Sequence, residues 1–258
     1  PGDGLRGAVR MTDPVPEGDL DALRIDLAAA FRLTARFGWH ESVGNHFSAA
    51  VSADGQRFLI NPKWRHFAAV RASELLLLDA GDPAVMETEA APDPSAWTVH
   101  AALHRARPDL RVVLHCHPPH ATALAALADP DLPPIDMNTA RFWGDLAIDR
   151  DCSGIADDAA EGARIAAALG DRSTLLMANH GLTCTGTSVA QAFEQLYFFE
   201  TAARTVLLAR ASGAPLAVMS DAVAARTAEG WRAYAGMADA HFAHLKSVLD
   251  SEAPDYRH

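Results

Sequence analysis

Two histidines placed two residues apart, His115 and His117, are the side chains of this sequence best spaced for chemistry. They follow an apolar run at 112–114, and two prolines at 118–119 end that run. The run predicts a buried strand, on which residues two apart point to the same face. Both imidazoles can therefore bind one metal ion, although such pairs also occur as packing or hydrogen-bonding residues.

A third histidine, His180, lies in an Asn-His-Gly turn after a second apolar stretch at 174–178. Three neutral imidazoles on rigid strand ends would bind a divalent ion and leave at least one position open to water or substrate. His100 and His104 share one face of a predicted helix. No third ligand is near them in the sequence, so we expect them to be surface or interface residues.

The motifs around these histidines resemble the class II aldolase/adducin family. Leu-His-Cys-His at 114–117 precedes Asn-His-Gly-Leu at 179–182, and Gly-Asn-His-Phe-Ser at 44–48 and Ile-Asn-Pro at 60–62 come before both. The resemblance runs from about residue 20 to about residue 211. It implies an α/β fold, a three-layer α/β/α class II aldolase-like domain with a largely antiparallel central sheet. We expect one such domain over 19–258.

The resemblance also implies a cofactor and a chemistry. Its metal ligands are His115, His117 and His180, holding one divalent ion; zinc is expected first, with manganese, iron or cobalt as alternatives. Such an ion acts as a Lewis acid on a substrate oxygen and stabilises an enolate as charge develops. Members include sugar-phosphate aldolases, an epimerase, a dehydratase and decarboxylases. They commonly form tetramers, so we expect a homo-oligomer that binds a small-molecule substrate.

Departures from the sugar-phosphate aldolases argue against a phosphorylated substrate. Ala96 occupies the position of their general acid/base glutamate, and alanine cannot transfer a proton. Met137 falls near a tyrosine that they take from a neighbouring subunit. Asn45 and Ser95 of the phosphate pocket are kept as substrate-binding candidates, but Trp64 replaces a glycine.

Three residues are candidates for the missing acid/base: Glu41 before the Gly-Asn turn, His66 in the loop after Asn-Pro, and His120 shortly after the metal pair. Each can equally be a solvated or hydrogen-bonded loop residue. Arg141 could bind a substrate carboxylate through two parallel hydrogen bonds, or form a subunit salt bridge. The aromatic residues at 142–143 favour a planar or aromatic carboxylate.

Hydrophobic periodicity predicts an opening helix from Leu20 to Phe37, and strands at 44–51 and 57–61 joined by an Asp-Gly turn. The run at 75–79 suits a central buried strand, and a helix at 95–107 has Ser95 as its expected N-cap. Further predicted elements are helices at 119–127, 157–169, 188–211 and 225–249, with mixed strand and loop at 138–149.

Composition limits the partners. The formal net charge is -11, from 22 basic and 33 acidic residues, so we expect no nucleic-acid partner. No apolar run reaches membrane-spanning length, and the three cysteines have no paired spacing, which favours a cytoplasmic setting. Cys116 alternates with the histidine pair and should point into the core. Residues 1–18 are expected to form a disordered extension.

We therefore expect a metal-dependent carbon–carbon lyase that cleaves or decarboxylates a small, non-phosphorylated hydroxy or oxo acid through a metal-stabilised enolate. One alternative is a non-haem iron oxygenase or oxidative decarboxylase on the same three histidines, because the chain looks like the family branch with an aminocoumarin-pathway decarboxylase/oxygenase. The other is a non-catalytic interaction domain similar to the adducin head. Retention of the three histidines argues against that domain, whereas loss of the glutamate at position 96 argues for it.

Overall fold

A seven-stranded sheet forms the centre of the computed structural model, which describes residues 17–89, 91–151, 154, 158–234 and 236–258. The strand order is β3-β2-β1-β4-β7-β6-β5, and the neighbouring strands are antiparallel except for the parallel pair β5 and β6. The strands are β1 (His46–Ala50), β2 (Arg57–Ile60), β3 (Leu76–Asp79), β4 (Val112–Cys116), β5 (Leu146–Asp149), β6 (Thr174–Met177) and β7 (Gly181–Gly186).

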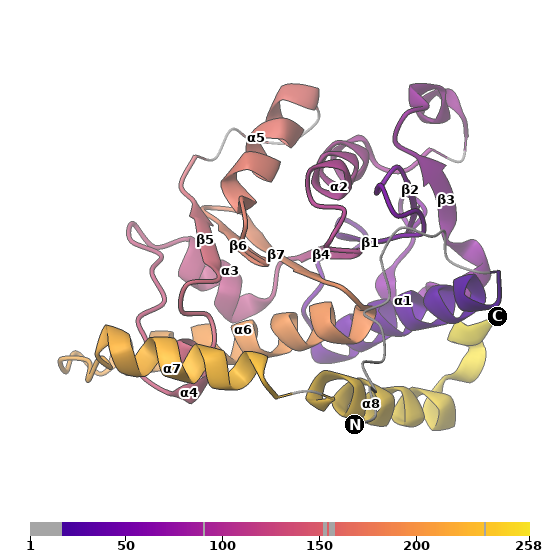
Figure 1. Cartoon of the computed structure of the whole chain (residues 1–258). Helices are drawn as coiled ribbons and strands as arrows, with labels where there is room; N and C mark the ends of the chain where they lie inside the picture. Colours follow the sequence, from indigo (N-terminus) through magenta and orange to yellow (C-terminus); the bar gives the residue numbers. More distant parts are fainter. Residues whose placement is uncertain (1–16, 90, 152–153, 155–157, 235) are drawn as a thin grey trace, which may run out of the picture.

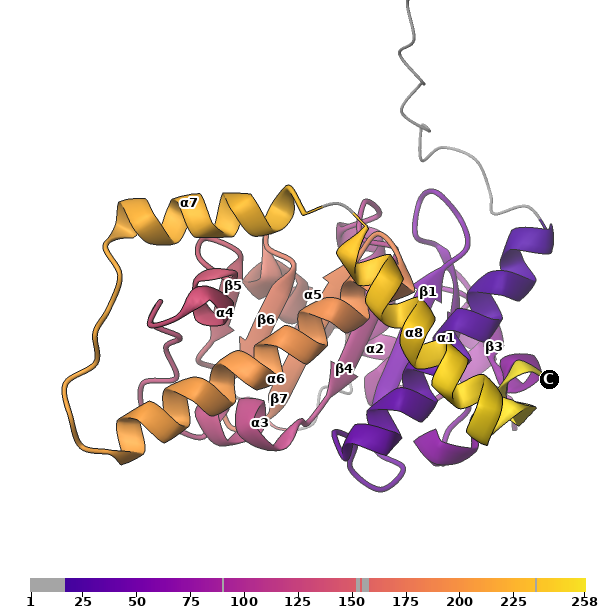
Figure 2. The ribbon, with the colours of Figure 1, turned by 90° about the horizontal axis from the view of Figure 1, so that it is seen from below.

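Helices cover both faces of this sheet (Figure 1). One face carries α2 and α5, and the other carries α1 and α6, with α8 packed outside them (Figure 2). The fold is thus a three-layer α/β/α arrangement around a mostly antiparallel sheet, as the resemblance implied. The helices are α1 (Glu17–Phe37), α2 (Pro94–Ala106), α3 (Pro119–Ala125), α4 (Met137–Ala140), α5 (Ala159–Leu169), α6 (Val189–Ala211), α7 (Asp221–Arg232) and α8 (Met237–Glu252).

Strand β4 divides its side chains between the two layers. Leu114 and Cys116 belong to the large apolar cluster on the side of α1 and α6, which confirms the core position predicted for the cysteine. Val113 packs in a second cluster with residues of α2 and α5. Because side chains alternate along a strand, His115 shares the face of Val113, on the side of α2.

The prediction that the run at 75–79 is a central strand was wrong, because β3 lies at the edge of the sheet. Its continuous apolarity has another cause. Leu75 and Leu77 pack with the large cluster, whereas Leu76 and Leu78 pack with a third cluster that includes Phe58 of β2. Both faces of this edge strand are therefore covered by side chains.

Three predicted element bounds also change. The expected last helix at 225–249 is two helices, α7 and α8, separated around Gly236, whose φ of 83° does not continue a helix. The N-cap of α2 is Asp93, whose Oδ1 accepts a hydrogen bond from Ser95 N at 3.0 Å. Of the expected extension, residues 1–16 lie outside the described residues, and Glu17 already opens α1.

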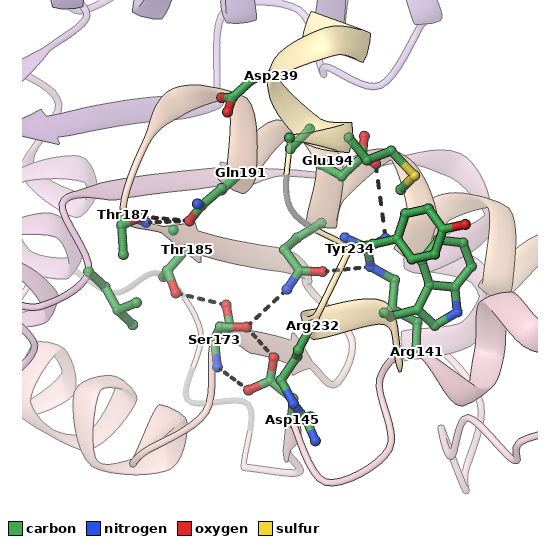
Figure 3. Close-up of a pocket in the computed structure, with 17 residues that line it drawn as sticks. Arg141, Asp145, Ser173, Thr185, Thr187, Gln191, Glu194, Arg232, Tyr234 and Asp239 are labelled. Atoms are coloured by element: carbon green, nitrogen blue, oxygen red, sulfur yellow. Dashed lines mark hydrogen bonds and ion pairs between the residues drawn. The ribbon is translucent and has the colours of Figure 1, made fainter. Parts of the chain in front are cut away.

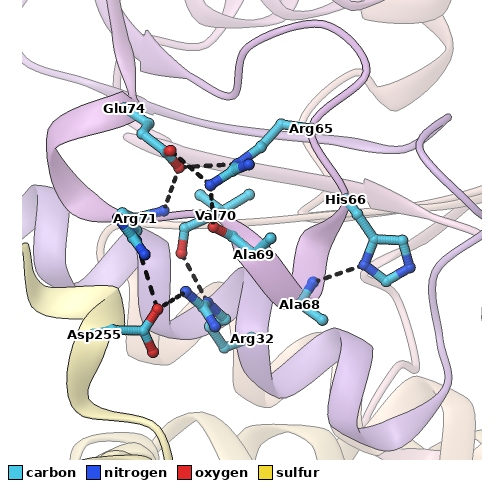
Figure 4. Close-up of polar contacts among 9 residues, drawn as sticks. All are labelled: Arg32, Arg65, His66, Ala68, Ala69, Val70, Arg71, Glu74 and Asp255. Atoms are coloured by element: carbon cyan, nitrogen blue, oxygen red, sulfur yellow. Dashed lines mark hydrogen bonds and ion pairs between the residues drawn. The ribbon is translucent and has the colours of Figure 1, made fainter.

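The C-terminal turn is fastened to α1 and to the loop before β3 (Figure 4). Asp255 Oδ2 lies 2.9 Å from Arg32 Nη2 and 3.5 Å from Arg71 Nε. Tyr256 beside it is fully buried. The described part of the chain contains no helix that is both long and apolar enough to cross a bilayer.

Candidate metal centre

The structure brings together the three histidines that the sequence singled out. One ring nitrogen from each of His115, His117 and His180 lies within 4.8 Å of the other two. The Nε2 atoms of His115 and His117 are 3.2 Å apart. Zinc–nitrogen bonds of tetrahedral sites place neighbouring ligand nitrogens roughly 3.3 Å from each other. The spacing therefore suits two imidazoles that share one ion.

Adjacent strands hold these rings in place. His115 lies on β4 and His117 directly follows it, while His180 occupies the turn between β6 and β7. That turn places Asn179 at a φ of 56°, a left-handed conformation that asparagine tolerates better than most residues. Gly181 lacks a side chain where one could not fit, because a Cβ there would lie 2.3 Å from Cδ2 of His117. The Asn-His-Gly sequence thus makes room for the neighbouring ligand.

The outer nitrogens of two rings are already engaged. His117 Nδ1 lies 2.6 Å from Oε2 of Glu41, and His115 Nδ1 lies 3.1 Å from Thr183 Oγ1. A carboxylate can only accept, and the Thr183 hydroxyl donates its own hydrogen to Met177 Sδ at 3.7 Å. The Glu41 carboxylate therefore holds the proton of neutral His117 on Nδ1 and leaves its Nε2 lone pair facing His115 Nε2. Two Nε2 atoms this close can bind one cation, so the donor set fits a divalent metal ion.

Burial keeps His115 and His180 neutral. Desolvation, reinforced by the neighbouring rings, holds the pKa of His115 well below its ordinary value. Desolvation and then the nearby His117 lower the pKa of His180 to about 4. A metal ligand must be the unprotonated imidazole, so both rings are in the required form at neutral pH.

The cluster opens into a pocket of about 330 Å³ on the α2 side of the sheet. Ser95 lines it, and the Ser95 hydroxyl donates to Asp93 Oδ1 at 2.7 Å. Ala96 does not line it and instead packs in the apolar cluster with Phe58. The described lining residues include no lysine or arginine; they are Gly44, His46, Ser95, Val99, His115, His117, Gly154, Met177, Asn179 and His180.

Two residues of the predicted site, Glu41 and Asn45, lie in the loop at 41–45, whose Gly44 lines this pocket. Asn45 is buried and does not line the pocket, because its Oδ1 accepts a hydrogen bond from Glu41 N at 2.7 Å. Glu41, an acid/base candidate, reaches the cluster only through His117. The asparagine therefore positions the glutamate backbone, and the glutamate orients a ring of the cluster.

The other two acid/base candidates lie outside the pocket lining. His66 Nδ1 accepts a hydrogen bond from Ala68 N at 3.1 Å and so caps a short 3-10 turn (Figure 4). The Nε2 atom of His66 lies 3.1 Å from His40 Nε2. His120 Nδ1 lies 2.6 Å from Oε1 of Glu200, which also accepts from the backbone at the start of α3. Local hydrogen bonds thus account for the positions of both rings.

Arg141 lines a different pocket, of about 550 Å³, between α6 and the junction of α7 and α8 (Figure 3). The two pockets share no lining residue. Arg141 Nε lies 3.3 Å from Gln195 Oε1, and its guanidinium lies over the rings of Phe198 and Trp231, at 4.5 and 5.1 Å. Within one chain, Arg141 does not meet the histidines, which corrects the expected carboxylate clamp.

The aromatic residues next to it are also placed elsewhere. Phe142 is 3% exposed and packs edge-on against Phe199, with ring centroids 5.1 Å apart. Trp64 is 65% exposed, and neither it nor Phe142 lines the pocket of the histidines. The expectation of an aromatic lining is therefore not met within the described part of the chain.

A second group of histidines lies directly behind the first, and the sequence analysis missed its importance. His46 lines the pocket, stands opposite His115 across β1 and β4, and stacks on its ring at 4.9 Å. It leads through His100 and Ser48 to His104, all buried. The expectation that His100 and His104 are surface or interface residues was wrong. Two spacings could have revealed the group: positions 46 and 48 share one strand face, and positions 100 and 104 share one helix face.

Comparison with known proteins identifies the family. The model of the class II aldolase and adducin N-terminal domain matches residues 25–207. An aldolase II superfamily protein from Pseudomonas syringae has 33% sequence identity and a TM-score of 0.84, covering 94% of this chain and 98% of that one.

Among curated relatives, Decarboxylase NovR from Streptomyces niveus is 28% identical over 89% of this chain and 87% of its own length. A 4-hydroxy-3-prenylphenylpyruvate oxygenase/4-hydroxy-3-prenylbenzoate synthase from Streptomyces roseochromogenus subsp. oscitans is 27% identical, over 86% and 82%. With its fold, its histidine cluster and these relatives in agreement, the chain belongs to the class II aldolase/adducin family.

Proposed function

We propose that the protein is a metal-dependent carbon–carbon lyase whose ion is held by His115, His117 and His180. The observation that carries this proposal is the convergence of one ring nitrogen from each histidine within 4.8 Å of the other two, with the outer nitrogens of His117 and His115 next to Glu41 and Thr183. Outer partners of this kind fix the tautomer and orientation of metal-binding histidines.

A bound divalent ion would supply a Lewis acid for a substrate oxygen, which is what cleavage next to a carbonyl requires. The chain supplies the rest. The Glu41 carboxylate holds the His117 ring from outside, and the strand register holds the other rings. When the carbon–carbon bond breaks, its electron pair stays on the carbon next to the carbonyl as an enolate, and a proton must then reach that carbon. With an alanine buried at position 96, water in the pocket is our proposed proton source.

The proposed substrate is a small hydroxy or oxo acid without a phosphate. Val99 and Met177 give the pocket apolar walls, and the described lining contains no cationic side chain to bind a phosphate. A relative named as a decarboxylase supports a substrate with a carboxyl group. We propose zinc as the first metal to test, with manganese, iron and cobalt after it, since three imidazoles accept all four. A homo-oligomer and a cytoplasmic location remain part of the proposal.

An oxygenase is the second candidate, favoured by the relative named as a prenylphenylpyruvate oxygenase. Three imidazoles with open positions would also hold ferrous iron, and dioxygen would then be a co-substrate. The two chemistries differ in one measurable quantity: the oxygenase consumes dioxygen with each turnover, whereas the lyase works without it. An adducin-like interaction domain would show neither reaction.

The test is a screen of oxo and hydroxy acids with the zinc-loaded and iron-loaded protein, with and without oxygen. Released carbon dioxide and carbonyl products are measured, and the H180A variant is the control. We expect anaerobic turnover that H180A lacks. Turnover only with oxygen would favour the oxygenase. An absence of turnover with every metal, despite bound metal, would contradict both enzymatic proposals.

A further inference from the structure

Three buried rings and one hydroxyl form a continuous hydrogen-bonded chain between α2 and β1. His46 Nδ1 lies 2.8 Å from His100 Nε2, His100 Nδ1 contacts Ser48 Oγ, and Ser48 Oγ lies 2.7 Å from His104 Nε2. His100, Ser48 and His104 are fully buried, and His46 is 5% exposed. One end of the chain reaches the pocket, because His46 lines it.

His100 and His104 are neutral at ordinary pH, because burial lowers the pKa of His104 to about 3 and that of His100 well below its usual value, and His46 is nearly as buried and shares a hydrogen bond with His100. A neutral imidazole has one N–H and one lone pair, and a serine has one hydroxyl hydrogen. The chain can therefore run in two directions. Protons on every Nε2 make His104 donate to Ser48, Ser48 to His100, and His100 to His46. Protons on every Nδ1 reverse each of these bonds.

The far end of the chain distinguishes the two directions. His104 Nδ1 is buried and has no hydrogen-bond partner among the residues that the structure describes. In the reversed direction this atom would carry a buried N–H without an acceptor, whereas in the first direction it is only an unused lone pair. Orphaned buried N–H groups are rarer and costlier than under-satisfied acceptors. The unpartnered atom therefore selects protons on Nε2 throughout the chain.

We propose that His46 presents an Nε2–H donor to the pocket and binds an oxygen of the substrate, with His100, Ser48 and His104 as positioning residues that fix its tautomer. No residue in the described part of the chain hydrogen-bonds to His46 Nε2. This atom is also not among the fully buried side-chain atoms that lack a partner, so it is free to meet a ligand. The ring stacks on His115, so the donor lies beside the metal cluster.

This placement narrows the substrate class, and it rests on the proposed function. A 2-oxo or 2-hydroxy acid carries oxygens on adjacent carbons, so one could bind the ion while another accepts a hydrogen bond from His46. A simple carboxylate lacks the oxygen on the neighbouring carbon. With no lysine or arginine in the described lining, His46 is a neutral substrate donor that the pocket offers next to the metal ligands.

Nitrogen-15 NMR of the metal-free protein tests the tautomer directly. Two-bond nitrogen–proton correlations of histidine-labelled protein report which ring nitrogen carries the proton, and the H46Q variant assigns the signals of His46. We expect Nε2–H in His46, His100 and His104. A proton on Nδ1 of His46 would overturn the proposal, because the ring would then show a lone pair to the pocket.

A matched pair of variants tests the donor. In H46N the side-chain oxygen can still accept from His100, but nothing reaches the position of Nε2; in H46Q an amide N–H reaches it. Calorimetry of the zinc-loaded proteins with pyruvate should show affinity about tenfold weaker in H46N and nearly unchanged in H46Q. Acetate affinity should be equal in all three proteins.

The outcomes separate this inference from the proposed function. The donor role would be overturned if all three proteins bound zinc equally and H46N bound pyruvate as tightly as the wild type. The lyase proposal would then still stand. A wild-type protein that binds none of zinc, manganese, iron and cobalt would contradict the proposed function, and the NMR tautomer of His46 would still decide the inference.

Discussion

Two groups of three histidines lie side by side in this protein and are built differently. In the metal cluster, formed by positions 115, 117 and 180, a carboxylate and a hydroxyl outside the cluster contact the outer nitrogens of two rings, and one nitrogen of each ring lies within 4.8 Å of the other two. In the buried chain, formed by positions 46, 100 and 104, the rings and one serine satisfy each other. The residue type is the same in both groups, and the partners of the outer nitrogens differ.

This difference shows why counting histidines does not locate a metal site. A ring whose outer nitrogen donates to an oxygen acceptor must offer a lone pair on the other side, which is the form a cation needs. A ring that donates to a second ring instead fixes which nitrogen of that second ring carries the proton. Experiments that damage one group and spare the other therefore separate the two roles.

Acid should have the largest effect, and it acts on the buried chain as well as on His115 and His180, whose pKa values burial also lowers. The pKa values of His46 and His104 are near 3 in the folded protein, below the ordinary 6.5, so the unfolded state takes up protons first as the pH falls. This stability is fully present above pH 6.5 and is lost down to about pH 3. Each ring should cost about 2 kcal/mol between pH 7 and pH 5. Urea unfolding of the metal-free protein at both pH values measures the loss, and equal midpoints would refute it.

H180A should have the next largest effect, confined to the metal cluster. Removing one of three ligands should weaken zinc binding by at least about 100-fold, more than the loss of an outer partner. Competition with a chelating dye measures the affinity, and H120A is the control because His120 lies outside the pocket lining. Undiminished zinc binding in H180A would reject the assigned ligands.

Glu41 should contribute less than a ligand. E41A removes the acceptor of His117 Nδ1 and should weaken zinc binding about tenfold, whereas E41Q keeps an acceptor oxygen and should lose less. The same competition assay ranks the three proteins. If E41A and E41Q bind zinc as well as the wild type, the carboxylate does not orient the ring.

The smallest effect belongs to Arg141, which lies in the other pocket. R141K should leave zinc affinity unchanged while loosening α7, because the flat guanidinium over Trp231 is lost. Zinc competition and hydrogen exchange of α7 measure the two quantities. A large loss of zinc affinity would show that the two pockets are linked.

Local spacing explains how much of this could be predicted. The apolar runs before His115 and His180 predicted strands that end at a common site, because alternation and turn residues are local signals. The run at 75–79 is apolar because side chains cover both faces of β3, and such a run does not distinguish an edge strand from a central strand. The buried chain links residues of β1 to residues of α2 that are more than fifty positions apart in the sequence, so only the folded protein reveals it.

X-ray absorption at the metal edge of the zinc-loaded protein tests the central claim most directly, because it reports the atoms bound to the ion. We expect three imidazole nitrogens at about 2.0–2.1 Å, and two in H180A. Sulfur ligands, or an imidazole count that H180A does not change, would contradict the metal centre.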